Sequence, residues 1–89
     1  MHVRPRDIWQ DKSGVGAYLF IMRAVPESQF VLVSPIFWSD RIHLWLMRRD
    51  VFLDGYKKFD PRKITKSIVA ARFNREIERR VRWIESHDK

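Results

Sequence analysis

The chain has 89 residues, of which 45% are apolar and 33% are charged, a composition typical of one small globular domain. It contains no cysteine, which excludes disulfide bridges, cysteine-ligated zinc and a thiol nucleophile. Eighteen Lys and Arg residues oppose eleven Asp and Glu residues, and the net charge of +7 favours polyanionic partners such as nucleic acid or an acidic protein surface.

The N-terminal segment carries charges and Pro5 but no apolar core of the kind that a signal peptide needs. The longest apolar run, 17–22, is too short to cross a bilayer. We therefore expect a cytoplasmic protein without a membrane partner, folded as a single domain over residues 1–89. A short strand around Trp9 and a turn over 11–14 are the first expected elements.

The next elements predict an antiparallel hairpin. Two apolar runs, 16–25 and 29–38, flank a break at Pro26, as in a hairpin of two strands. Because Pro35 cannot donate a hydrogen bond to a neighbouring strand, we expect the far end of the second strand at an edge or a bulge of the sheet.

Alternating side chains over 41–49 predict a third strand. Asp54-Gly55 is typical of a turn, here between a strand at 51–53 and another at 56–59. The expected fold class is α+β. An antiparallel sheet of three to five strands, or a partly open barrel, occupies residues 6–59, and a helix packs on one face.

The C-terminal third predicts a basic amphipathic helix over 70–87. Asp60-Pro61 is a good helix start, but the apolar phase slips afterwards, so 60–69 is either helix or a last strand. From residue 70 the apolar side chains recur every three or four residues. We expect this stripe to pack on the aliphatic residues of the sheet, with Phe73, Ile77, Val81 and Ile84 facing Leu19, Ile21, Val31, Val33, Leu44 and Leu46.

The strongest candidate site is an arginine ridge on the reverse of that helix, bordered by Trp83. At 100° per residue its four members share one narrow band: Arg72, Arg75, Arg79 and Arg82. Guanidinium groups bind phosphate through paired hydrogen bonds, so the ridge suits a nucleic-acid backbone. The alternative is a solvated surface, because Glu76 and Glu78 stand four residues before Arg80 and Arg82, the favourable order for helical ion pairs.

A second candidate set interleaves basic and aromatic residues, as in sheet-based binders of single-stranded nucleic acid. The same aromatic residues would serve equally as core or as anchors of a protein interface. The set comprises Trp45, Arg48, Arg49, Phe52, Tyr56, Lys57, Lys58 and Phe59. The basic residues expected to extend the ridge as a nucleic-acid surface are Lys57, Lys58, Arg62, Lys63 and Lys66.

Catalytic patterns are missing from the sequence. His2, His43 and His87 are far apart and lack ligand-spaced partners, and no serine has the context of a nucleophile elbow. We therefore expect a non-enzymatic protein without metal or cofactor.

One resemblance extends over about half of the chain. The run Arg6–Trp9, followed by the apolar runs Tyr18–Met22 and Phe30–Pro35, is similar to the small SH3-like barrel of the MazF and PemK ribonuclease toxins. The resemblance implies a barrel-like sheet closed by a helix, and RNA cleavage as a third functional alternative. The chain lacks the Arg-Pro pair that these toxins carry before their second strand, at the position associated with catalysis.

Two functions follow from these patterns. The first is binding of a nucleic-acid backbone, DNA or RNA, through the arginine-faced helix. The second is a phage- or plasmid-encoded inhibitor or adaptor that docks on a larger complex, with Trp38, Trp45 and Trp83 as anchors. Pairing of a free sheet edge with a second copy would make a homodimer.

Overall fold

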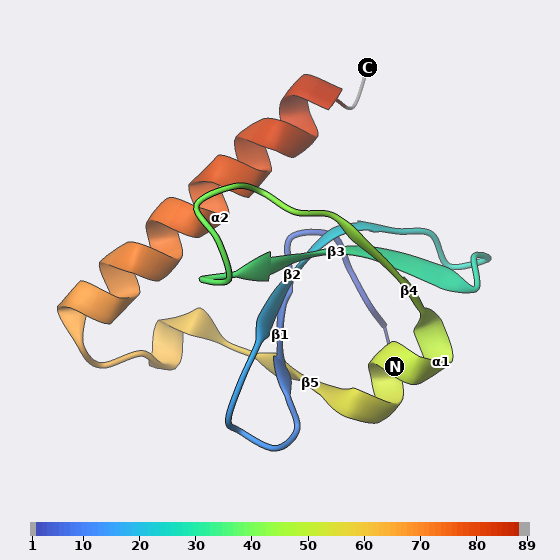
Figure 1. Cartoon of the computed structure of the whole chain (residues 1–89), viewed down its shortest axis with the longest axis horizontal. Helices are drawn as coiled ribbons and strands as arrows, with labels where there is room; N and C mark the ends of the chain where they lie inside the picture. The colour runs from blue at the N-terminus through green and yellow to red at the C-terminus, as the bar shows by residue number, and fades with distance from the viewer. Residues whose placement is uncertain (1, 88–89) are drawn as a thin grey trace.

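The computed structural model describes residues 2–87. The elements follow in the order β1 (Ile8–Asp11), β2 (Tyr18–Ala24), β3 (Phe30–Ile36), β4 (Trp45–Arg48), α1 (Arg49–Gly55), β5 (Tyr56–Phe59), the 3-10 helix η1 (Pro61–Lys63) and α2 (Ser67–His87). The strands form one antiparallel sheet in the order β4-β3-β2-β1-β5, with α2 lying across it (Figure 1). The predicted α+β class is confirmed, and the sheet is a half-barrel consistent with a small SH3-like open barrel.

The predicted hairpin is β2–β3, and the predicted edge position of Pro35 is confirmed as well. On the side away from β2, β3 pairs with β4 only from Phe30 to Val33. Among the described strands, none therefore pairs with the last three residues of β3 on that side. This leaves the carbonyl of Pro35 available to a side chain from α2.

The segment predicted as a strand at 51–53 is helical instead. It belongs to α1, which places Phe52 in the core while Val51 stays exposed. The Phe52 ring packs between Trp9 and Tyr56, at centroid distances of 4.9 and 5.4 Å. A short apolar run fits a strand and a helical turn equally well. The prediction was wrong here because the packing of the Phe52 ring in the core determines that the segment is helical.

The sheet face covered by α2 is the opposite of the predicted one. Below α2 lie Ile8, Phe20, Met22 and Ile36, which pack with Phe73. The residues expected under the helix line the other face, the barrel interior, where Leu19, Ile21, Val31 and Val33 pack with Trp9 and Phe52. Because 19–22 is buried on both faces, alternation could not distinguish them. Leu44 and Leu46, which were also expected under the helix, belong to neither core cluster and are 40% and 67% exposed.

The helix α2 begins at Ser67, three residues before the predicted start at residue 70. The segment left open as helix or strand contains η1, where Asp60 accepts a hydrogen bond from the Arg62 backbone N–H at 3.0 Å. The first turn of α2 bears exposed Ile68 and Val69, which explains the slip in the apolar phase. No helix within residues 2–87 is long and apolar enough to cross a membrane.

Truncation of Phe73 should measure how much the packing of α2 stabilises the fold. Phe73 is 3% exposed, so we expect Phe73→Ala to lower the free energy of unfolding by about 3–5 kcal/mol. Ile68, 76% exposed on the same helix, provides the control, and Ile68→Ala should change it by less than about 0.5 kcal/mol. Urea denaturation followed by circular dichroism measures both, and equal effects would contradict the packing described above.

Candidate polyanion-binding groove

A buried arginine joins the middle of α2 to the end of β3. Arg80 is fully buried, and its guanidinium donates to Ser34 Oγ at 2.9 Å and to the Pro35 carbonyl at 2.8 Å. It also donates to Glu76 Oε1 at 2.8 Å, one turn earlier on the helix. A buried charge is tolerated only when it is paired and hydrogen-bonded, and these partners meet that condition.

Glu76 extends this connection to the loop that follows β3. Its carboxylate, 14% exposed, also accepts from Arg79 Nη1 at 3.1 Å. Arg79 in turn donates from Nη2 to the Asp40 carbonyl at 2.6 Å. Burial disfavours the charged form of Glu76, but the hydrogen bonds from Arg80 and Arg79 outweigh it, and the net result is a pKa below the usual glutamate value.

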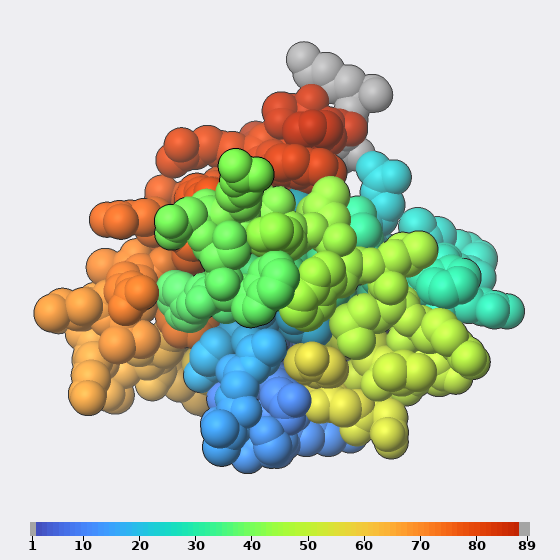
Figure 2. All heavy atoms as spheres, in the orientation of Figure 1, coloured from blue at the N-terminus to red at the C-terminus, as the bar shows by residue number. Residues whose placement is uncertain are grey.

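The segment 37–44, which links β3 to β4, crosses in front of α2 (Figure 1). It forms the green prominence beside the orange and red helix in the space-filling view (Figure 2). Phe37 begins it with φ at 67°, in the left-handed region that costs a bulky residue about 1–2 kcal/mol. Its ring packs edge-on against Phe73 at 4.8 Å, which offsets part of that cost.

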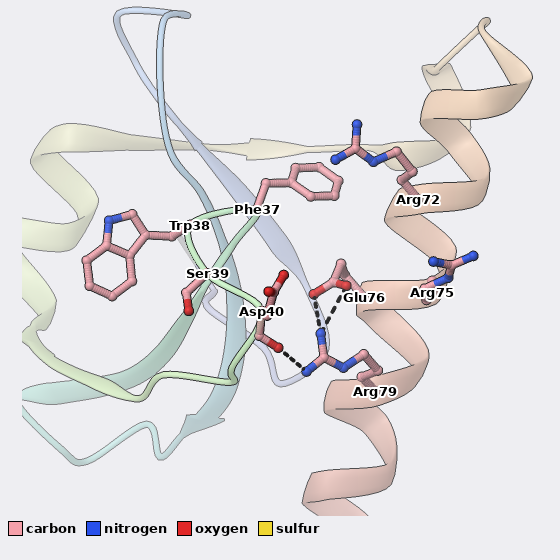
Figure 3. Close-up of a pocket in the computed structure, with 8 residues that line it drawn as sticks. All are labelled: Phe37, Trp38, Ser39, Asp40, Arg72, Arg75, Glu76 and Arg79. Carbon is pink, nitrogen blue, oxygen red and sulfur yellow. Dashed lines mark hydrogen bonds and ion pairs between the residues drawn. The ribbon is translucent and has the colours of Figure 1, made fainter.

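Between this segment and α2 lies a groove of about 340 Å³. Its lining residues are Phe37, Trp38, Ser39, Asp40, Arg72, Arg75, Glu76 and Arg79 (Figure 3). The Arg72 guanidinium lies 5.3 Å from the centre of the Phe37 ring, and Arg75 makes no hydrogen bond or ion pair with another of the described residues. Three guanidinium groups and two carboxylates, those of Asp40 and Glu76, line the groove, so its lining carries a net positive charge.

The structure brings three of the four ridge arginines together. Arg82 is exposed, lies 3.6 Å from Glu78 and does not line the groove. Trp83 stacks on His87 at 3.9 Å and lines a different hollow with Met22 and Leu32. The groove therefore contains three of the four arginines of the predicted ridge, and Trp83 does not border it.

The other basic residues of the predicted site form a separate group. Lys58, Arg62 and Lys63 line a second hollow with Arg6, on the flank of α2 that carries Ile77. Carboxylates already engage two of them, since Asp7 lies 3.5 Å from Lys58 and Asp60 lies 3.1 Å from Arg62. Lys57 and Lys66 are exposed and line neither hollow.

The members of the second predicted set near β4 have structural partners. Trp45 packs against the barrel core. Arg48 pairs with Asp50 at 2.8 Å, and Arg49 donates to the Val25 and Ser28 carbonyls at 2.6 and 3.2 Å. Arg49 therefore ties the start of α1 to the turn between β2 and β3, whereas Arg48 forms a local, exposed ion pair.

Sequence reasoning missed Arg80 as a buried link and Phe37 as a groove residue. Trp38, expected only as a protein anchor, is 61% exposed at the rim of the groove. Its ring contacts His43 and Trp45 edge-on at 4.7 and 5.4 Å. In sequence, Arg80 could have been recognised because it lies seven residues after Phe73, on the buried face of the helix.

No protein-family model matches the chain, and no curated protein or solved structure shows significant similarity to it. Among residues 2–87, no group of three or more His, Asp or Glu side chains is placed to hold a metal ion.

Removal of the Arg80 guanidinium should destabilise the whole fold. Arg80→Ala leaves Glu76 and the Pro35 carbonyl without their buried partner, and we expect a loss of about 3–5 kcal/mol in the free energy of unfolding. Arg75→Ala, the same truncation at an exposed position of α2, should cost less than about 0.5 kcal/mol. A cost for Arg80→Ala as small as the control, in urea denaturation, would contradict the structural role.

Glu76 should make stability sensitive to acid. Its pKa is lower in the folded than in the unfolded state, so it stabilises the fold above the unfolded value of about 4.3 and this contribution is lost as the pH falls through the folded pKa. We expect the free energy of unfolding of Glu76→Gln to change less than that of the wild type between neutral pH and pH values below about 4. Parallel acid dependences of the two proteins would contradict the ion pair.

Proposed function

We propose that the chain is a non-enzymatic nucleic-acid-binding protein whose groove between α2 and segment 37–44 holds backbone phosphates. The observation that carries the proposal is that Arg72, Arg75 and Arg79 line one groove, with Arg75 unpaired among the described residues. An arginine without a carboxylate partner can bind phosphate without first breaking an ion pair. The net charge of +7 supports the proposal because it attracts polyanions over long range.

The three arginines have different parts in this proposal. Arg75 points away from segment 37–44 in Figure 3 and is the first contact for a phosphate. Arg72 lies over Phe37, which restricts its side chain while leaving donors free. Arg79 is held by Glu76 and the Asp40 carbonyl, so it mainly keeps the loop against the helix and contributes positive potential.

Charge reversal inside and outside the groove tests this function. Arg75→Glu and Arg82→Glu change the net charge equally and lie on the same helix, but only Arg75 lines the groove. We expect Arg75→Glu to weaken binding of labelled single-stranded and duplex oligonucleotides and to reduce the slope of log K against log salt by about 0.7–0.9 for each phosphate that the variant no longer binds. Arg82→Glu should leave the slope within error of the wild type.

Fluorescence anisotropy at several salt concentrations provides both the affinity and the slope. Wild-type affinity that does not change with salt would contradict the proposal. An equal weakening of binding in the two variants would mean that charge acts without regard to the groove and would contradict it as well.

A second candidate function, protein binding, is favoured by the free edge of the sheet at β4. This strand is at one end of the strand order and carries Leu46, 67% exposed, beside exposed Leu44 and Phe30. An extended segment of a partner can add to such an edge through backbone hydrogen bonds while apolar side chains supply contact area. The charge of the chain favours an acidic segment.

Nuclease treatment separates this second function from the first. If it is correct, a partner protein captured from lysate should remain bound after nuclease digestion, bind in purified form, and no longer bind to Leu46→Lys. The substitution is at an exposed position, so it should leave the fold intact. A partner that disappears with nuclease, or that binds Leu46→Lys as well as the wild type, would contradict docking at β4.

A further inference from the structure

A second hollow adjoins the groove and differs from it in character. It has a volume of about 320 Å³ and is lined by Gly16, Ala17, Tyr18, Ile36, Phe37 and Trp38, none of which carries a charge. Phe37 and Trp38 line the groove as well. A cationic groove and an uncharged, mainly apolar hollow therefore share one wall made of two aromatic residues.

The backbone at this wall turns the two aromatic side chains in different directions. Phe37 adopts a left-handed conformation and its ring lies toward Arg72, whereas Trp38 points to the far side of the segment (Figure 3). The edge-on contacts of Trp38 with His43 and Trp45 hold the indole in place although it is 61% exposed. An exposed ring held in this way presents a rigid face for stacking.

The residues Gly16 and Ala17 leave room in the hollow for a flat ligand. Gly16, with φ at 153°, has no side chain, and a Cβ there would come no closer than 3.9 Å to its nearest neighbour, on Asp11. Ala17 beside it is also small and exposed. The hollow thus suits a planar, largely apolar group, and the arginines next to it suit an anion attached to that group.

We infer that the hollow takes an unpaired nucleobase stacked on Trp38, with phosphates of the same strand in the adjoining groove, so that the ligand is single-stranded nucleic acid. The inference rests on the proposed function and adds the substrate class to it. In a duplex the faces of the bases are covered by their neighbours, and only a single strand can offer one to an aromatic side chain. Sequence preference is not required, because every base has such a face.

Three ligands with the same number of phosphates separate bases from charge: an oligothymidylate, a duplex, and an oligomer in which abasic sites replace the thymidines. We expect the wild type to bind the oligothymidylate about tenfold or more tightly than the abasic oligomer. Trp38→Leu, which keeps an apolar side chain but removes the aromatic face, should abolish this preference. Trp83→Leu is the matched control, and Arg75→Glu should weaken all three ligands together.

The outcomes distinguish this inference from the function on which it rests. Equal binding of the oligothymidylate and the abasic oligomer, or tighter binding of the duplex, would overturn the single-strand inference and leave the phosphate groove intact. A preference that survives in Trp38→Leu would overturn the assigned base site. Failure to bind any of the three ligands at low salt would overturn both proposals. Circular dichroism of each variant confirms that the fold is retained.

Discussion

The hydrogen bonds of the buried Arg80 guanidinium determine where α2 lies on the sheet. Apolar packing alone would let a helix slide along a flat apolar face, but Arg80 must meet Ser34 and the Pro35 carbonyl at the same time. The carbonyl of Pro35 is available to Arg80 because β4 does not pair with this end of β3. A proline is tolerated at such an edge because it has no N–H to donate to a neighbouring strand. The groove exists because the helix is held at this point of the sheet.

The chain uses its arginines for two different purposes. Arg80 and Arg49 bind carbonyl oxygens of the chain itself, Arg79 joins the helix to a loop, and Arg48 and Arg62 pair with nearby carboxylates. The net charge of the chain does not distinguish arginines that bind groups of the chain itself from arginines that are free to bind a ligand. The groove combines an arginine, Arg75, that no described group neutralises with a second arginine, Arg72, that lies over an aromatic ring.

The sequence predicted the α+β class, the β2–β3 hairpin and the C-terminal helix, because hydrophobic period and turn residues are local signals. It could not predict which face of the sheet meets the helix, since Leu19–Met22 is apolar on both sides. The short apolar run at 51–53 was also predicted as a strand, but it forms part of a helix that buries Phe52. Three ridge arginines were placed correctly on one face, but the loop opposite them depends on the left-handed backbone of Phe37, for which the sequence has no signal.

The separation of the two apolar cores has a consequence for how such a protein can diversify. No residue of the barrel interior, which includes Trp9, Leu19 and Phe52, lines the groove or the hollow beside it. Most of the candidate contacts lie instead on exposed positions of one helix and one connecting loop. Related chains could therefore exchange these contact residues, and with them their ligands, while the barrel that supports them stays unchanged under selection.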